Sequence, residues 1–205
     1  MYMDDYLDSA RVLDEAVNRA KEVKRILAEG DFHFQDWISN VPAFSAALRS
    51  TSKTRPISQG VKVLGIGWNT NLDHLYLVIG EADNIIYHRF GISNFVSGIF
   101  DPLGFASPWI VKEKIKSSEL STKDVVWDEI IREEDQVWWK EWIASLSQIK
   151  KMDLPRCIFP DEGLIVSSEL HIFNDASEEA FASVVYLRHV YSSNQVAICL
   201  VIAKS

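Results

Sequence analysis

The sequence predicts an α+β fold, because helical and β-like patterns occupy separate stretches of the chain. Apolar residues recur at helical spacing from Leu13 to Leu27 and again from Asp124 to Ile149. β-Favouring runs separated by turn residues occupy residues 61–79 and residues 169–202. The stretch from residue 169 to residue 202 contains three such runs, which indicate an antiparallel sheet near the C-terminal end.

The composition is that of an ordinary globular protein, with 205 residues of which 47% are hydrophobic and 24% charged. This length allows one large domain or two small ones. Cys157 and Cys199 provide neither a disulfide framework nor metal-site spacing, so we expect both thiols to be reduced.

Composition also bears on the compartment and the partners. No apolar run approaches the ~18–20 residues that span a bilayer, and no signal-peptide pattern follows Met1. We therefore expect an intracellular, cytoplasmic chain that has no membrane partner. The net charge of −8 counts against an autonomous nucleic-acid-binding protein, but it is compatible with a fragment of a longer polyprotein.

The opening stretch is Tyr2-Met3-Asp4-Asp5, in which two adjacent carboxylates lie between short β-favouring runs. This pattern fits a tight hairpin with the acids at its tip. Mg²⁺ prefers oxygen ligands, and two such ions support phosphoryl transfer. The alternative is an N-terminal turn that is merely rich in Asp.

Several elements are predicted in the first half. Asp8 or Ser9 can cap the first helix, and Gly30 can end it. Aromatic residues in the stretch from Asp31 to Val41 suggest a strand. Residues 61–69 and 74–79 are predicted to pair as a hairpin, and residues 84–88 form a further β-like run.

The second half begins with a predicted helix at residues 89–100. A turn follows at residues 102–104, and Asp101 can cap the next helix. The long helical pattern from Asp124 to Ile149 carries a tryptophan-rich stripe, which we interpret as core. Trp139 falls outside this stripe and is predicted to face a partner. Acidic neighbours would repel phosphate, so we do not predict base stacking on this helix.

Leu154-Pro155-Arg156-Cys157 ends this region, and the loop from there to Ser168 is predicted to be a linker. Three β-like runs then end the chain. Asp175 lies at the end of the first run. Two interpretations stay open for it: a catalytic carboxylate, or a residue that caps a turn together with Ser177.

The motifs resemble, in order, those of BEL/Pao-type LTR retrotransposon polyproteins, a stretch also known as the Pao retrotransposon peptidase family. The opening Tyr-Met-Asp-Asp is similar to the metal-binding hairpin of reverse transcriptases. The other matching segments are Trp37-x-Ser39-Asn40, Val63-Leu64-Gly65-Ile66-x-Trp68-Asn69, Asp101-Pro102-Leu103-Gly104-x-x-Ser107-Pro108 and Asp175-Ala176-Ser177.

This resemblance implies a domain organisation. Residues 1–88 would be the C-terminal part of a reverse-transcriptase palm with a primer-grip-like hairpin. Residues 89–158 would be a helical thumb and connection region. Residues 169–205 would be the first strands of a ribonuclease H-like domain.

It also implies sites and partners. Asp4 and Asp5 would bind Mg²⁺ at the polymerase site, and Asp175 would bind Mg²⁺ for hydrolysis of RNA in a hybrid. Leu64, Gly65 and Trp68 would contact nucleic acid. The partners would be an RNA or DNA template-primer, an RNA–DNA hybrid and the rest of the polyprotein.

Departures from the family pattern argue that this chain alone is inactive. Asp36 stands where the family usually has Lys, and further metal-binding acids are expected before Met1 and after Ser205. One alternative is a non-catalytic remnant or interaction module of a decayed element. Another is an aspartic peptidase, but Asp8-Ser9-Ala10 and Asp175-Ala176-Ser177 lack the glycine that its paired Asp-Thr/Ser-Gly loops need.

Overall fold

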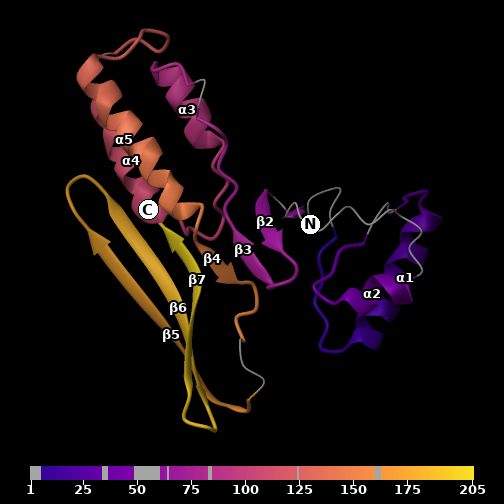
Figure 1. Cartoon of the computed structure of the whole chain (residues 1–205). Coiled ribbons are helices and arrows are strands. Elements are labelled where there is room, and N and C mark those ends of the chain that lie inside the picture. Colours follow the sequence, from indigo (N-terminus) through magenta and orange to yellow (C-terminus); the bar gives the residue numbers. More distant parts are fainter. Residues whose placement is uncertain are drawn as a thin grey trace. The chain divides into compact units, whose positions relative to one another are not determined.

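The computed structural model describes residues 6–33, 37–48, 61–63, 65–82, 85–123, 125–159 and 163–205. They form a mixed α+β structure of two compact units, one ending at His74 and the other beginning at Leu75 (Figure 1). The predicted residues Asp4, Asp5, Asp36 and Leu64 lie outside the described residues.

The first unit is built on the predicted N-terminal helix. Helix α1 (Leu13–Glu29) buries Val17 against Phe44 of the short helix α2 (Pro42–Ala47) and ends at Gly30 as expected. The predicted cap is wrong, because α1 starts after Val12 and has no side-chain cap. Asp8 instead forms an ion pair with Arg19, with 3.1 Å between Oδ1 and Nη1.

The strand predicted in residues 31–41 is also wrong for the described residues of that stretch. Its described aromatic residues, Phe32 and Trp37, lie outside any strand. Trp37 instead packs edge-on against Tyr6 and Phe44, with ring centroids 6.1 and 6.4 Å away. Trp37 therefore belongs to a local aromatic cluster and not to a strand.

The β-like run at residues 61–69 forms a hairpin by itself. Strand β1 (Val61–Val63) pairs antiparallel with β2 (Ile66–Asn69), and Val63 is opposite Ile66. Gly65 turns the chain with a φ of 86°, which glycine adopts without steric cost. The predicted turn after Asn69 is confirmed, and strand β3 (His74–Tyr76) follows it.

The core of the second unit lies between helices. Helices α3 (Arg89–Ser97), α4 (Ser107–Thr122) and α5 (Glu133–Ile149) precede the short strand β4 (Asp153–Pro155). Trp139, Leu146 and Ile149 of α5 are almost completely buried. Helices α4 and α5 lie side by side, joined by a Lys116–Asp135 ion pair of 2.8 Å (Figure 1).

Three predictions in this unit need correction. Helix α5 begins at Glu133, so Trp127 lies in a turn before it. The N–H of Ile131 donates to the carbonyl of Tyr87 and is therefore not available for a hydrogen bond within a helix. Residues 85–88 form only an isolated bridge and no strand. Trp139, predicted to face a partner, is 0% exposed.

The predicted C-terminal sheet is confirmed. Strands β5 (Ile165–Ala176), β6 (Phe181–Tyr191) and β7 (Val196–Lys204) form a three-stranded antiparallel sheet in that order (Figure 1). Strand β5 begins inside the stretch predicted to be a linker. Nearly all of its residues are exposed.

The prediction that Asp101 caps the next helix is wrong, because α4 begins after Ala106 and has no side-chain cap. Asp101 instead holds the turn before α4, and this turn connects the helices to the sheet. The Asp101 carboxylate accepts hydrogen bonds from the N–H groups of Gly104, Phe105 and Ala106, at 2.7–2.9 Å. The carbonyl of Leu103 in the same turn accepts a hydrogen bond of 2.8 Å from the N–H of Ala203. The turn therefore fixes the end of β7 to the start of α4.

Among the described residues, no helix has the length and apolar character that crossing a membrane requires.

Candidate functional site

Asp175 is the best-placed candidate for chemistry in the second unit. It lies one residue before the end of β5, opposite Ala182 of β6, and its side chain is exposed. Its Oδ1 accepts a hydrogen bond of 3.0 Å from the N–H of Ala176. The following turn is held by Ser177, whose hydroxyl bonds the backbone of Glu179 and Ala180. The turn thus forms through Ser177, and the carboxylate of Asp175 faces solvent.

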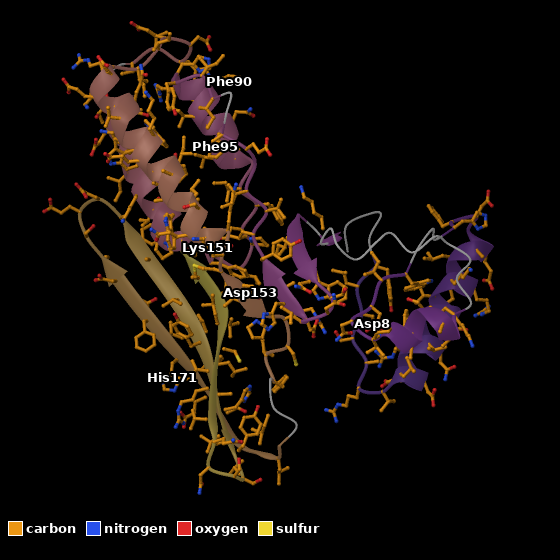
Figure 2. The ribbon with its side chains drawn as sticks, in the orientation of Figure 1. Asp8, Phe90, Phe95, Lys151, Asp153 and His171 are labelled. Carbon is orange, nitrogen blue, oxygen red and sulfur yellow. The ribbon has the colours of Figure 1, made fainter. Side chains whose placement is uncertain are left out.

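A charged cluster lies on the same face of β5. Alternate residues of a strand share a face, which places Glu169 and His171 on the side of Asp175. Glu169 contacts His171 at 3.1 Å and Arg188 of β6 at 3.2 Å; Figure 2 shows His171 on β5. The hydrogen bond with His171 and the charge of Arg188 lower the pKa of Glu169, so this carboxylate is held ionised.

Glu169 is too far from Asp175 to share a metal ion with it. Six residues separate them along an extended strand that rises ~3.3 Å per residue, which gives a separation of about 20 Å. Within the described residues, no group of three His, Cys, Asp or Glu side chains could hold a metal. Asp175 therefore fits as one oxygen ligand of a hard cation such as Mg²⁺, and the described residues do not supply two further ligands that would complete a metal site with it.

The predicted nucleic-acid contacts belong to the first unit. Gly65 forms the turn of the β1–β2 hairpin, and Trp68 lies half-buried on β2. The indole N–H of Trp68 donates to Asp73 Oδ1 at 2.9 Å. This bond fixes the indole next to the β2–β3 turn.

A pocket in the second unit was not predicted from the sequence. It lies between α3, α4 and the turn before α5, and Arg89 and Trp127 contribute to its wall. The guanidinium of Arg89 lies 5.0 Å from the centre of the Trp127 ring. These two residues are 38 positions apart, so only the fold brings them together.

The structure thus defines a mixed α+β domain with an exposed carboxylate near the end of the first strand of an antiparallel sheet. Residues 89–205 match the family described as Pao retrotransposon-like RNaseH-like domain. Because the match covers more than half of the chain, the chain belongs to this family. No curated protein and no solved structure matches the chain significantly.

Proposed function

We propose that this chain is a segment of a Pao-type polyprotein in which Asp175 serves the hydrolysis of RNA in an RNA–DNA hybrid. The observation that carries this proposal is the position of Asp175. It is an exposed carboxylate near the end of the first strand of a domain that belongs to an RNaseH-like family. The side chain of Ser177 forms the adjacent turn, which leaves the Asp175 carboxylate available to a ligand.

The metal ion in this proposal is Mg²⁺, bound jointly by carboxylates and the phosphates of the substrate. When bound, it activates water and offsets the charge that develops on phosphate oxygens. Asp175 contributes one negative oxygen ligand at the edge of the sheet, and the exposure of β5 leaves room for a nucleic-acid backbone. The remaining acids of the site would come from other parts of the polyprotein.

The polymerase part of the proposal concerns residues 1–88. Asp4 and Asp5 would bind Mg²⁺ at a reverse-transcriptase site, and Leu64, Gly65 and Trp68 would contact the template-primer. Sequence resemblance supports this assignment, and the tight β1–β2 hairpin around Gly65 is compatible with close approach of a nucleic-acid backbone. Residues 89–158 would be the thumb and connection region in the same scheme.

We propose further that the chain alone cleaves no hybrid. The support is that, among the described residues, Asp175 belongs to no group of three His, Cys, Asp or Glu side chains that could hold a metal. One carboxylate cannot hold two divalent ions in fixed positions. A chain without activity also fits a non-catalytic remnant of a decayed element, and the experiment below separates the two.

The experiment measures Mg²⁺-dependent cleavage of a labelled RNA–DNA hybrid by this chain and by the complete polyprotein of the same reading frame. The proposal expects cleavage by the polyprotein and none by the chain. Asp175→Asn in the polyprotein should abolish cleavage, because an amide is a poorer ligand for Mg²⁺ than a carboxylate. Glu178→Gln removes an exposed carboxylate from the neighbouring turn and should leave cleavage unchanged.

Two results would contradict the proposal. Cleavage by the Asp175→Asn polyprotein at the rate of the unmodified protein would remove Asp175 from the site. A polyprotein that never cleaves the hybrid would favour the non-catalytic remnant.

A further inference from the structure

The pocket between α3, α4 and the turn at Trp127 has the composition of a ligand site. Its volume is about 270 Å³. Ile92 and Leu120 give it an apolar floor and are 3% and 2% exposed. The remaining wall consists of one cation, one aromatic ring and four hydroxyl groups, contributed by Arg89, Trp127, Ser93, Ser117, Ser118 and Ser121.

Arg89 is a half-buried cation whose hydrogen bonds within the described residues go to neutral groups. Its guanidinium donates to the carbonyl of Val125 at 2.9 Å and to Ser121 Oγ at 2.7 Å. These bonds leave further N–H groups of the five available. Among the described residues, no carboxylate lies within ion-pair distance of it. Because a partly desolvated charge is costly unless it is paired, an anion in this pocket would be stabilised.

The serine hydroxyls divide into two pairs. Ser117 donates to Glu113 Oε1 at 2.6 Å, and Ser121 donates to the carbonyl of Ser117 at 2.9 Å. Their protons are therefore used inside the protein. Ser93 and Ser118 make no side-chain hydrogen bond within the described residues and can donate to a ligand.

Trp127 adds an aromatic surface to this anion site. Its ring is near the Arg89 guanidinium, and the residue is 47% exposed. Unpaired bases stack on such rings without regard to sequence, with a gain of about 1–3 kcal/mol for each base. The sequence argued against base stacking on residues 124–149 because of their acidic neighbours. In the structure, however, Trp127 lies in the turn before α5, and Asp128 and Glu129 do not line the pocket. Figure 2 marks Phe90, which follows Arg89 at the start of α3.

We propose that this pocket binds one nucleotide of a single-stranded nucleic acid. The phosphate is bound by Arg89, Ser93 and Ser118, and the base stacks on Trp127. The inference rests on the proposed nucleic-acid function but uses a site other than Asp175. A pocket of 270 Å³ corresponds to roughly nine water molecules at about 30 Å³ each, which suits one nucleotide rather than a duplex.

The test is fluorescence anisotropy of a labelled oligothymidylate of about ten nucleotides, titrated with the complete chain at low salt in EDTA. The expected plot of log affinity against log salt has a slope of about −0.7, the value for one phosphate contact on a single strand. Arg89→Gln should weaken binding about tenfold or more, since it removes a charge-assisted hydrogen bond. Thymidine monophosphate should compete better than inorganic phosphate.

Arg89 also holds the turn at Val125, so a second pair of variants separates binding from folding. Ser118→Glu places a negative charge in the pocket without removing a structural contact. Ser147→Glu adds the same charge on the exposed side of α5. We expect about a tenfold loss for Ser118→Glu and less than about twofold for Ser147→Glu, because a distant surface charge is screened by salt.

Equal effects of the two glutamates would overturn the proposal, and so would a chain that does not bind the oligonucleotide. Because EDTA removes divalent ions, Asp175→Asn should bind as the unmodified chain does. A negative result in this binding test would therefore not contradict the proposed hydrolysis at Asp175. A negative result in the cleavage experiment would likewise not contradict nucleotide binding in this pocket.

Discussion

Gly104 lies in the turn that connects α4 to the sheet, and we predict that replacing it with alanine destabilises the fold. The φ of Gly104 is 78°, a conformation that alanine adopts only at a cost. A Cβ at this position would overlap the carbonyl of Ala203 and lie 3.0 Å from its Cα. The backbone of β7 would have to move away, and it is held there by the bond from Ala203 N–H to the carbonyl of Leu103, at 2.8 Å.

The expected loss for Gly104→Ala follows from two contributions. The left-handed backbone costs an L-residue about 1–2 kcal/mol. Displacement of β7 removes a hydrogen bond with a net contribution of about 1 kcal/mol. We therefore expect Gly104→Ala to lower the free energy of unfolding by about 2–3 kcal/mol.

Urea unfolding followed by circular dichroism measures this loss, and hydrogen exchange at the Ala203 amide locates it. The matched control is Gly80→Ala, because a Cβ on Gly80 meets nothing within 4 Å. This variant should be neutral or slightly stabilising, through the smaller entropy of its unfolded chain. A loss for Gly104→Ala no larger than that of the control, with protection of Ala203 unchanged, would refute the role given to this turn.

Three further substitutions test the interior of the second unit by urea unfolding. Burial raises the pKa of Glu113, so this carboxyl group keeps its proton to higher pH in the native state than in the unfolded chain. The free energy of unfolding should therefore fall as pH rises above about 4.5. Glu113→Gln should stabilise the chain at pH 7 but not at pH 4, and a stability difference that does not depend on pH would contradict this. Trp139→Ala should lower the free energy of unfolding by about 3–5 kcal/mol because the residue is 0% exposed. Trp138→Ala should lower it by less, and equal losses for the two variants would contradict this expectation. The buried Tyr191 hydroxyl has no partner among the described residues, so Tyr191→Phe should be neutral or stabilising, and a clear loss would reveal a bond to it.

Elements with a strong local signal were predicted well from the sequence. The apolar period of α1 and the glycine after it marked that helix within two residues of its observed end. The three C-terminal strands were recognised because β-favouring runs alternate with turn residues. The turn at residues 102–104 was also predicted, although Asp101 holds this turn and does not cap α4. In each case the deciding interactions join residues close in the sequence.

Errors arose where distant residues decide the structure. Trp127 and Ile131 fit the helical period of α5, but Ile131 bonds to Tyr87, more than 40 positions earlier, and the helix starts after it. Trp139 was placed outside the apolar stripe, yet it is buried in the same hydrophobic cluster as Ile92 of α3 and Leu120 of α4. The spacing of apolar residues along one helix cannot show how many sides of that helix other segments cover.

The candidate site shows the same division. The place of Asp175 near a strand end follows from local pattern, and the structure confirms that position. The pocket at Arg89 could not be predicted, because its cation, its hydroxyls and its indole come from three separate segments.

The most direct test of the central claim is an exchange of metal preference at Asp175 in the complete polyprotein. Asp175→Cys replaces a hard oxygen ligand with a thiolate, which binds Mg²⁺ poorly and softer ions such as Cd²⁺ well. The account predicts that Asp175→Cys loses cleavage of an RNA–DNA hybrid in Mg²⁺ and regains it when Cd²⁺ is added, whereas Glu178→Cys behaves as the unmodified protein does. Full cleavage by Asp175→Cys in Mg²⁺, or no recovery with Cd²⁺, would contradict a role for Asp175 as a metal ligand.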